Sequence, residues 1–133
     1  MQITLSNGAV LDCLGVHAKQ VTYQGVLRDC LIFLFNPDKY GVDEISDLFT
    51  SDNCTSVKIT DDSAEYIHNY YSIQSEAGKG YKDMVLYGTM LGSEQVENTD
   101  KRVYVKMLQT TLAERRLEEQ QKIIEKLLAE KVE

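Results

Sequence analysis

Residues 26–35 read Val26-Leu27-Arg28-Asp29-Cys30-Leu31-Ile32-Phe33-Leu34-Phe35, the most apolar stretch of the chain. Gln24-Gly25 precedes this stretch, and Asn36-Pro37-Asp38-Lys39-Tyr40-Gly41 follows it. Both flanks favour turns, because Gly adopts positive φ, Pro fixes φ, and Asn and Asp bond back to the backbone. An apolar run confined between turns to this length is typical of a buried β-strand. We therefore expect residues 26–35 to form the central strand of the core.

The residues before this strand predict more β-structure. Asn7-Gly8 separates two short apolar segments and favours a two-residue hairpin turn with positive φ angles. Residues 10–23 carry apolar side chains on both parities, which predicts a strand that is partly covered on both faces or bends near Gly15.

A short helix is expected directly after the Pro37 turn. Apolar residues in 42–49 follow helical spacing, and Asp43 and Glu44 lie near the favourable N-terminal dipole. This helix should cover the sheet through Ile45, Leu48 and Phe49.

Further strands are predicted in the second half. Residues 57–60 and 66–73 alternate with period two. Residues 75–80 are expected to form a polar loop, with Gly78-Lys79-Gly80 as a flexible hairpin tip. Residues 83–91 and 102–108 are expected to form a hairpin connected through 92–101. In the last strand, Val103, Val105 and Met107 should point to the core.

The composition changes at about Thr110, after which the chain lacks Gly and Pro and is rich in helix formers. A long helix is expected here, with apolar residues in a band wider than a two-stranded coiled coil requires. The band consists of Leu112, Leu117, Ile123, Ile124, Leu127 and Leu128. We interpret these residues as an oligomer interface, although the helix packing on its own domain would also cover the band.

These elements predict an α+β, mainly β fold, with an antiparallel sandwich or barrel-like sheet. The globular domain spans residues 1–108, and residues 109–133 form an amphipathic, coiled-coil-like helix. The 133 residues leave room for one ordinary core, and 43% hydrophobic with 26% charged residues is typical of a folded globular protein.

Charge and segment composition limit the partners and the compartment. With 14 Lys and Arg against 21 Asp and Glu, the net charge of −7 disfavours nucleic acid and anionic membranes. The opening residues lack the basic and apolar pattern of a secretory signal, and no apolar run is long enough for a membrane helix. We expect synthesis in a bacterial cytoplasm, with Cys13, Cys30 and Cys54 as reduced thiols, two of them in apolar surroundings.

No catalytic, metal or cofactor motif is recognisable, so we expect no enzyme activity and no cofactor. Cys13 and His17 are too far apart on a strand for a catalytic pair. An acidic group at Asp61, Asp62 and Glu65 fits a solvated turn better than a calcium loop. A tyrosine cluster offers a possible binding surface, for which Tyr66, Tyr70 and Tyr71 are the candidates.

The order of segments carries a family resemblance. The segments that carry it follow the Asn7-Gly8 turn and come before a Glu-rich helix. They are Tyr23-Gln24-Gly25-Val26-Leu27-Arg28-Asp29, Val42-Asp43-Glu44-Ile45-Ser46-Asp47-Leu48-Phe49, Asn53-Cys54-Thr55-Ser56-Val57-Lys58-Ile59 and His68-Asn69-Tyr70-Tyr71-Ser72-Ile73. This pattern resembles small uncharacterised proteins encoded among tail and baseplate genes of Firmicute phages and prophages. The resemblance implies a virion structural or assembly component, and no functional residues transfer with it.

The sequence therefore predicts a non-catalytic assembly protein that forms a homo-oligomer, a trimer or higher, and contacts other phage structural proteins. Its final location would be the virion. Two alternatives stay open: a carbohydrate-binding or host-surface-binding module, and an intracellular adaptor or inhibitor from a mobile element.

Overall fold

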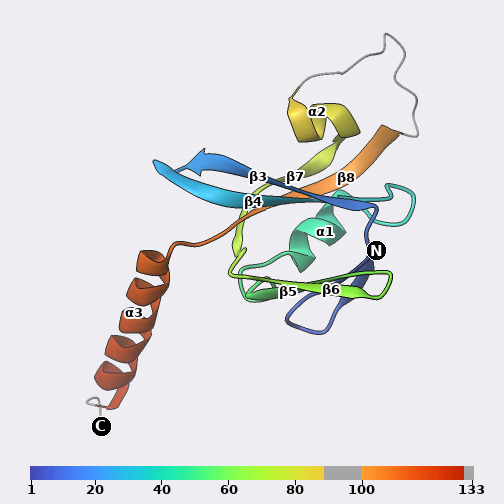
Figure 1. The fold of residues 1–133 in the computed structure, drawn as a ribbon. Helices are drawn as coiled ribbons and strands as arrows, with labels where there is room; N and C mark the ends of the chain where they lie inside the picture. Colours follow the sequence, from blue (N-terminus) through green and yellow to red (C-terminus); the bar gives the residue numbers. More distant parts are fainter. Residues whose placement is uncertain (89–99, 131–133) are drawn as a thin grey trace.

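A computed structural model describes residues 1–88 and 100–130 (Figure 1). The chain forms two four-stranded sheets with the orders β2-β1-β5-β6 and β3-β4-β8-β7, and all neighbouring strands are antiparallel. The strands are β1 (Gln2–Thr4), β2 (Val10–Asp12), β3 (Gly15–Tyr23), β4 (Val26–Phe35), β5 (Ser56–Asp61), β6 (Ala64–Asn69), β7 (Ile73–Tyr81) and β8 (Lys101–Leu108). The helices are α1 (Val42–Leu48), α2 (Lys82–Tyr87) and α3 (Leu112–Glu130). The mainly β fold with one long C-terminal helix is confirmed.

The core lies between the two sheets, with α1 inserted in the same layer (Figure 1). Strand β4 is an inner strand, as predicted, and its Leu31, Phe33 and Phe35 side chains point into this layer. Phe49 follows α1 and packs on them, with its ring centre 5.2 Å from that of Phe33. Ile45 and Phe49 are fully buried and Leu48 is partly buried, which confirms that this helix covers the sheet.

The other face of β4 has its own smaller core. Cys30, Ile32 and Leu34 pack there with Val85 and Leu86 of α2. Since both faces of β4 are covered, its sequence is apolar at consecutive positions instead of alternating.

Turn geometry follows the local sequence. Gln24 and Gly25 have φ angles of 53° and 75°, so they form a two-residue turn between β3 and β4, whose twist suits a hairpin. The first hairpin is also confirmed, but its loop is longer than predicted. Leu5 donates its amide to Ala9, and only Gly8 has positive φ, so the loop has three residues.

The segment 10–23 does bend near Gly15, and there it changes sheets. Strand β2 belongs to one sheet and β3 to the other. The Cys13 amide donates to the Met1 carbonyl and the Leu14 amide donates to the Leu34 carbonyl, so the crossing is hydrogen-bonded on both sides.

Three predictions for residues 66–91 are wrong. The strand expected over 66–73 ends at Asn69, because Tyr70 has φ 68° and turns the chain toward the second sheet. Residues 75–80 are not a hairpin tip but part of β7, which pairs with β8. Gly78 allows this pairing, since a Cβ there would lie 2.9 Å from the Tyr104 hydroxyl.

The strand expected over 83–91 is also wrong where it is described, because Lys82–Tyr87 is helical. Residues 89–91, and 92–99 of the predicted connection, lie outside the described residues. In β8, Val103, Val105 and Met107 are buried as predicted. On its other face Arg102, Tyr104 and Lys106 are half-buried and Leu108 is buried, because this face contributes to the second core with α2.

Candidate assembly interface

The helix α3 begins with a reciprocal cap. Thr111 accepts the Glu114 amide at its Oγ1 (3.2 Å), and Glu114 accepts the Thr111 amide at its Oε1 (2.8 Å). This Thr-x-x-Glu arrangement satisfies two backbone donors that the first helical turn leaves free. The start of α3 is therefore defined by its own sequence.

Arg28 of β4 binds the same glutamate. Its Nη1 and Nη2 donate to Glu114 Oε1 and Oε2 at 2.5 and 3.0 Å, and Nη1 also donates to the Gln109 carbonyl. The guanidinium is buried, with the residue only 4% exposed. The Arg28 hydrogen bond, with the Thr111 amide, holds the pKa of Glu114 at about 2.

The linker before α3 is hydrogen-bonded to β4 and to the residue that follows β6. The Gln109 amide donates to the Asp29 carbonyl and the Thr110 amide to the Tyr70 carbonyl, both at 2.9 Å. In the first turn, the Arg115 guanidinium lies over the Tyr70 ring, 4.0 Å from its centre. These contacts together with the Arg28 pair fix the base of α3, and thus its direction.

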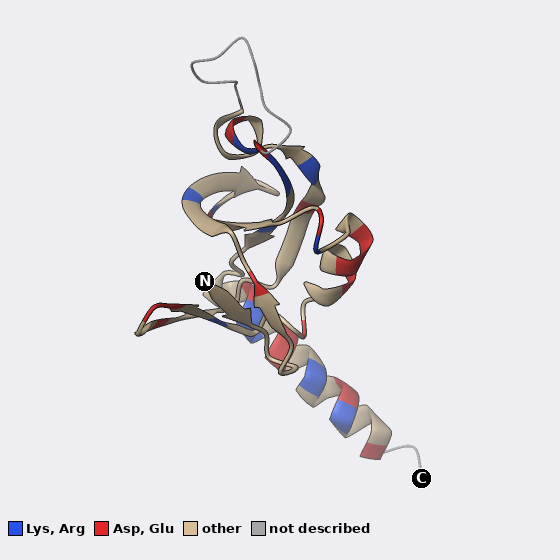
Figure 2. Cartoon of the chain, turned by 90° about the vertical axis from the view of Figure 1, so that its right-hand side faces the viewer, with Lys and Arg blue, Asp and Glu red and all other residues tan. Residues whose placement is uncertain are grey.

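Beyond this base, α3 extends away from the two sheets (Figures 1 and 2). The predicted interface residues all lie on it: Leu112, Leu117, Ile123, Ile124, Leu127 and Leu128. Each is between 51% and 66% exposed. We call these six residues the apolar band. Among the described residues of a single chain, none buries the apolar band. The helix α3 is therefore not packed on its own domain in this structure, which was the alternative that the sequence left open.

The predicted tyrosine surface is not assembled as one patch. Tyr66 on β6 is 55% exposed, whereas the Tyr70 ring is partly covered by Arg115. Tyr71 is buried in the main core beside His68, so it belongs to the core and not to an exposed surface.

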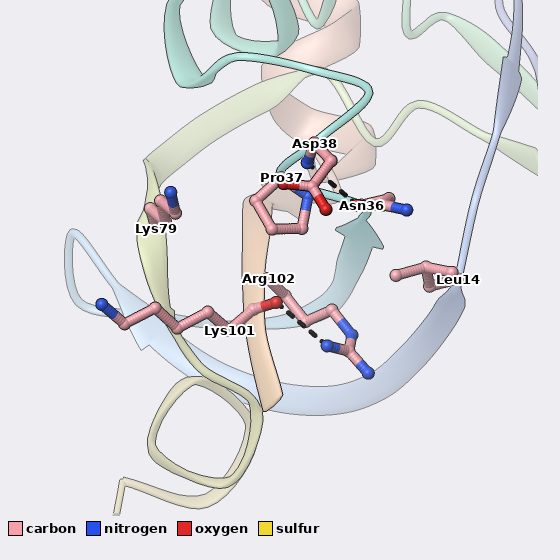
Figure 3. A pocket seen from close by; sticks show the side chains of 7 residues that line it. All are labelled: Leu14, Asn36, Pro37, Asp38, Lys79, Lys101 and Arg102. Carbon is pink, nitrogen blue, oxygen red and sulfur yellow. Dashed lines mark hydrogen bonds between the residues drawn. The ribbon is translucent and has the colours of Figure 1, made fainter. Parts of the chain in front are cut away.

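Two of the hollows formed by the described residues flank the sheets. The first, of about 680 Å³, is lined by Leu14, Asn36, Pro37, Asp38, Lys79, Lys101 and Arg102. Its cationic groups point in different directions (Figure 3), and Arg102 donates to the Lys101 carbonyl. The second hollow, of about 550 Å³, is a largely polar groove between the start of α3 and the loops around Asp52 and Ser72. Neither hollow focuses several reactive groups on one point.

The remaining candidate groups have structural surroundings. Asp61 and Asp62 lie at the β5–β6 turn, and Glu65 pairs with Lys58 at 3.2 Å. Cys13, Cys30 and Cys54 are buried free thiols, and burial raises the pKa of Cys54 to about 12. Among residues 1–88 and 100–130, no group of three His, Cys, Asp or Glu side chains is placed to hold a metal ion. Over the same ranges, no helix has the length and apolar character to cross a membrane.

Sequence reasoning missed the base of α3. The Thr111-x-x-Glu114 spacing is a recognisable capping signal, and Arg28 is a lone cation inside the most apolar segment. Their pairing across the chain has no local signature. The chain matches no protein-family model, no curated protein and no solved structure.

Proposed function

We propose that this protein is a non-catalytic assembly component whose C-terminal helix associates with the same helix of other copies. The observation that carries the proposal is an apolar band left exposed on a helix whose base is clamped to a folded body. Burying exposed Leu and Ile side chains is the main driving force for association in water.

The width of the apolar band favours more than two helices. Leu117, Ile124 and Leu128 form one stripe, and Leu112, Ile123 and Leu127 widen it on one side. A two-stranded coil covers only a narrow stripe, whereas three or more helices cover a wider one. We therefore infer a trimer or higher oligomer.

The clamped base supports association in a second way. Starting a helix in water is unfavourable, and ordering it on binding costs free energy. Here the cap and the Arg28–Glu114 pair hold the first turn before any partner arrives. Part of the ordering cost is thus met within the single chain.

The setting we propose is a phage tail or baseplate, where the oligomer would contact other virion proteins. Support for this setting is the resemblance in segment order together with a small body that carries an association helix. The acidic outer face of α1 in Figure 2, with Asp43, Glu44 and Asp47, is a surface that other proteins of the assembly could contact.

Paired substitutions on α3 test the helix interface. The variant Leu117→Asp with Ile124→Asp adds two negative charges to the apolar band. The control, Lys122→Gln with Ala129→Asp, makes the same net change of −2 on the opposite face of the helix. Light scattering should give a lower molar mass for the first variant and an unchanged mass for the control, with far-ultraviolet circular dichroism confirming a folded body in both. Equal masses for the wild type and both variants would contradict the proposal.

A further inference from the structure

The two sheets have four edge strands, and three of them are protected against pairing with another chain. Strand β2 has only three residues, and β3 carries Lys19. Strand β7 has Lys79 and an irregular register between Gln74 and Glu76. Short length, lysine and bulges are the usual devices that keep an edge from adding a strand.

Strand β6 lacks these devices. It has six residues in regular register with β5, and it contains neither Lys nor Pro. Its one charge, Glu65, is paired with Lys58 of the neighbouring strand. Tyr66 and Ile67, residues with high β-propensity, are 55% and 63% exposed. This strand therefore presents an apolar, regular and open edge.

The register with β5 determines which backbone groups point outward. Tyr70 donates its amide to the Thr55 carbonyl, and Asp61 lies opposite Ala64 across a two-residue turn. Because hydrogen-bonded pairs alternate in an antiparallel ladder, the even-numbered residues of β6 bond to β5. Glu65, Ile67 and Asn69 then direct their amides and carbonyls to the open edge. The Asn69 carbonyl already accepts a hydrogen bond from Gln109 Nε2, which agrees with its outward direction and leaves its second lone pair for a partner strand.

We infer that β6 pairs antiparallel with β6 of a second copy, with Ile67 opposite Ile67 on the two-fold axis. This pairing would join the two β2-β1-β5-β6 sheets into one continuous sheet. The outer edge of β6 is separate from α3, so this pairing does not depend on the association of the helices.

Among the registers centred on a residue whose backbone groups point outward, side-chain chemistry selects this one. A register centred on Glu65 would place two carboxylates opposite each other, which is unfavourable. One centred on Asn69 would need Tyr70 in the ladder, but Tyr70 has φ 68° and leaves the strand. Centred on Ile67, the ladder places Glu65 opposite Asn69 and Tyr66 opposite His68, so no like charges meet.

Charge complementarity beyond the strands also favours a second copy as the occupant. In the Ile67 register, the ladder ends where Glu65 of one copy lies opposite Asn69 of the other, next to Tyr70. The acidic turn that follows Asp61, with Asp62, then approaches the end of the partner where Arg115 lies over Tyr70. Because the pair is two-fold symmetric, Asp62 of one copy would approach Arg115 of the other at both ends of the ladder.

The pairing also places the two α3 helices apart. Each helix starts close to Tyr70, and antiparallel strands put the two Tyr70 ends at opposite ends of the ladder. The two helices of one pair thus remain available to other copies. The two interfaces together would join many copies into an extended assembly.

Cross-linking in the full chain tests this register. In the Leu117→Asp, Ile124→Asp background, Ile67→Cys should be joined into a covalent dimer by a short bismaleimide, since opposed residues of a hydrogen-bonded pair have Cα atoms about 5.5 Å apart. The matched control is Thr60→Cys, on the same face but one strand inward. Its two copies would be separated by three strand spacings, about 14 Å sideways alone. The buried native cysteines provide a background without reaction. Equal cross-linking of the two variants, or none in either, would overturn the proposal.

Molar mass separates this inference from the helix proposal. In the Leu117→Asp, Ile124→Asp background, the molar mass measured by sedimentation equilibrium should rise to twice 15.1 kDa between about 1 µM and 1 mM protein. Ile67→Lys should lower it to one copy, whereas Thr60→Lys should leave the dimer intact. A monomer throughout in the background chain would refute the strand pairing but leave the helix proposal standing. An unmodified chain with the same mass as the background chain would instead refute the helix proposal.

Discussion

Arg28 and Glu114 are 86 positions apart in the chain and form a bidentate ion pair at the base of α3. The arginine is buried on the central strand β4, and the glutamate also forms the helix cap together with Thr111. One pair therefore connects the core of the protein to the element that we propose for assembly.

Replacing Glu114 should weaken the whole fold, not only the helix. Glu114→Gln keeps a capping side chain but leaves the buried Arg28 charge without its counter-charge. We expect a loss of about 2–3 kcal/mol in the free energy of unfolding, typical of a lost hydrogen bond between charged groups. Urea denaturation measures it. The control Glu118→Gln, on the exposed part of the same helix, should change stability by less than about 0.5 kcal/mol.

The same pair predicts a pH dependence. The pKa of Glu114 is lowered to about 2 in the folded chain from an ordinary value of 4.5. Its stabilising contribution is therefore complete above about pH 4.5 and is lost as the pH falls toward 2. The difference in unfolding free energy between wild type and Glu114→Gln should shrink over this range. A difference that stays constant from pH 5 to pH 2 would contradict the role of the carboxylate charge.

Gly78 should be required for the packing of β7 against Tyr104. In Gly78→Ala the new Cβ would lie 2.9 Å from the Tyr104 hydroxyl, which donates to Glu76 Oε1. The tyrosine must move, at a cost of about 1–2 kcal/mol. Gly15→Ala is the matched control, because its Cβ would meet only Leu34 at an ordinary 3.9 Å. Thermal unfolding of the two variants compares them directly.

The three cysteines should be unreactive in the folded protein. All are buried, and burial raises their pKa values, that of Cys54 to about 12. Because the thiolate is the reactive form, a thiol reagent at pH 8 should label none of them before unfolding and all three in urea. Rapid labelling of one cysteine under native conditions would show that its part of the core opens readily.

The parts of the fold that sequence predicted well depend on local signals. The apolar run 26–35 between two turns, the helical spacing of Ile45, Leu48 and Phe49, and the Gly-free segment after Thr110 each define an element by themselves. The polar β7 had no such signal. Its strand conformation comes from pairing with β8, and the glycine at position 78 is explained by the neighbouring Tyr104 ring.

The same contrast between local signals and long-range contacts applies to the candidate interface. Helical periodicity was enough to name the apolar band on α3, since it depends on spacing within one helix. The clamp at Arg28 and the open edge of β6 depend on contacts between distant segments and on strand order. Tyr71 was a candidate for a binding surface but is buried. The local sequence does not show whether a tyrosine lies in the core or on the surface, because its ring is apolar and its hydroxyl is polar.

If α3 joins copies of the chain, the unmodified protein is an oligomer in solution, and its molar mass shows this. We expect at least three times 15.1 kDa by light scattering, with a mass that falls only on strong dilution. A mass of one copy at every concentration up to about 1 mM would contradict it.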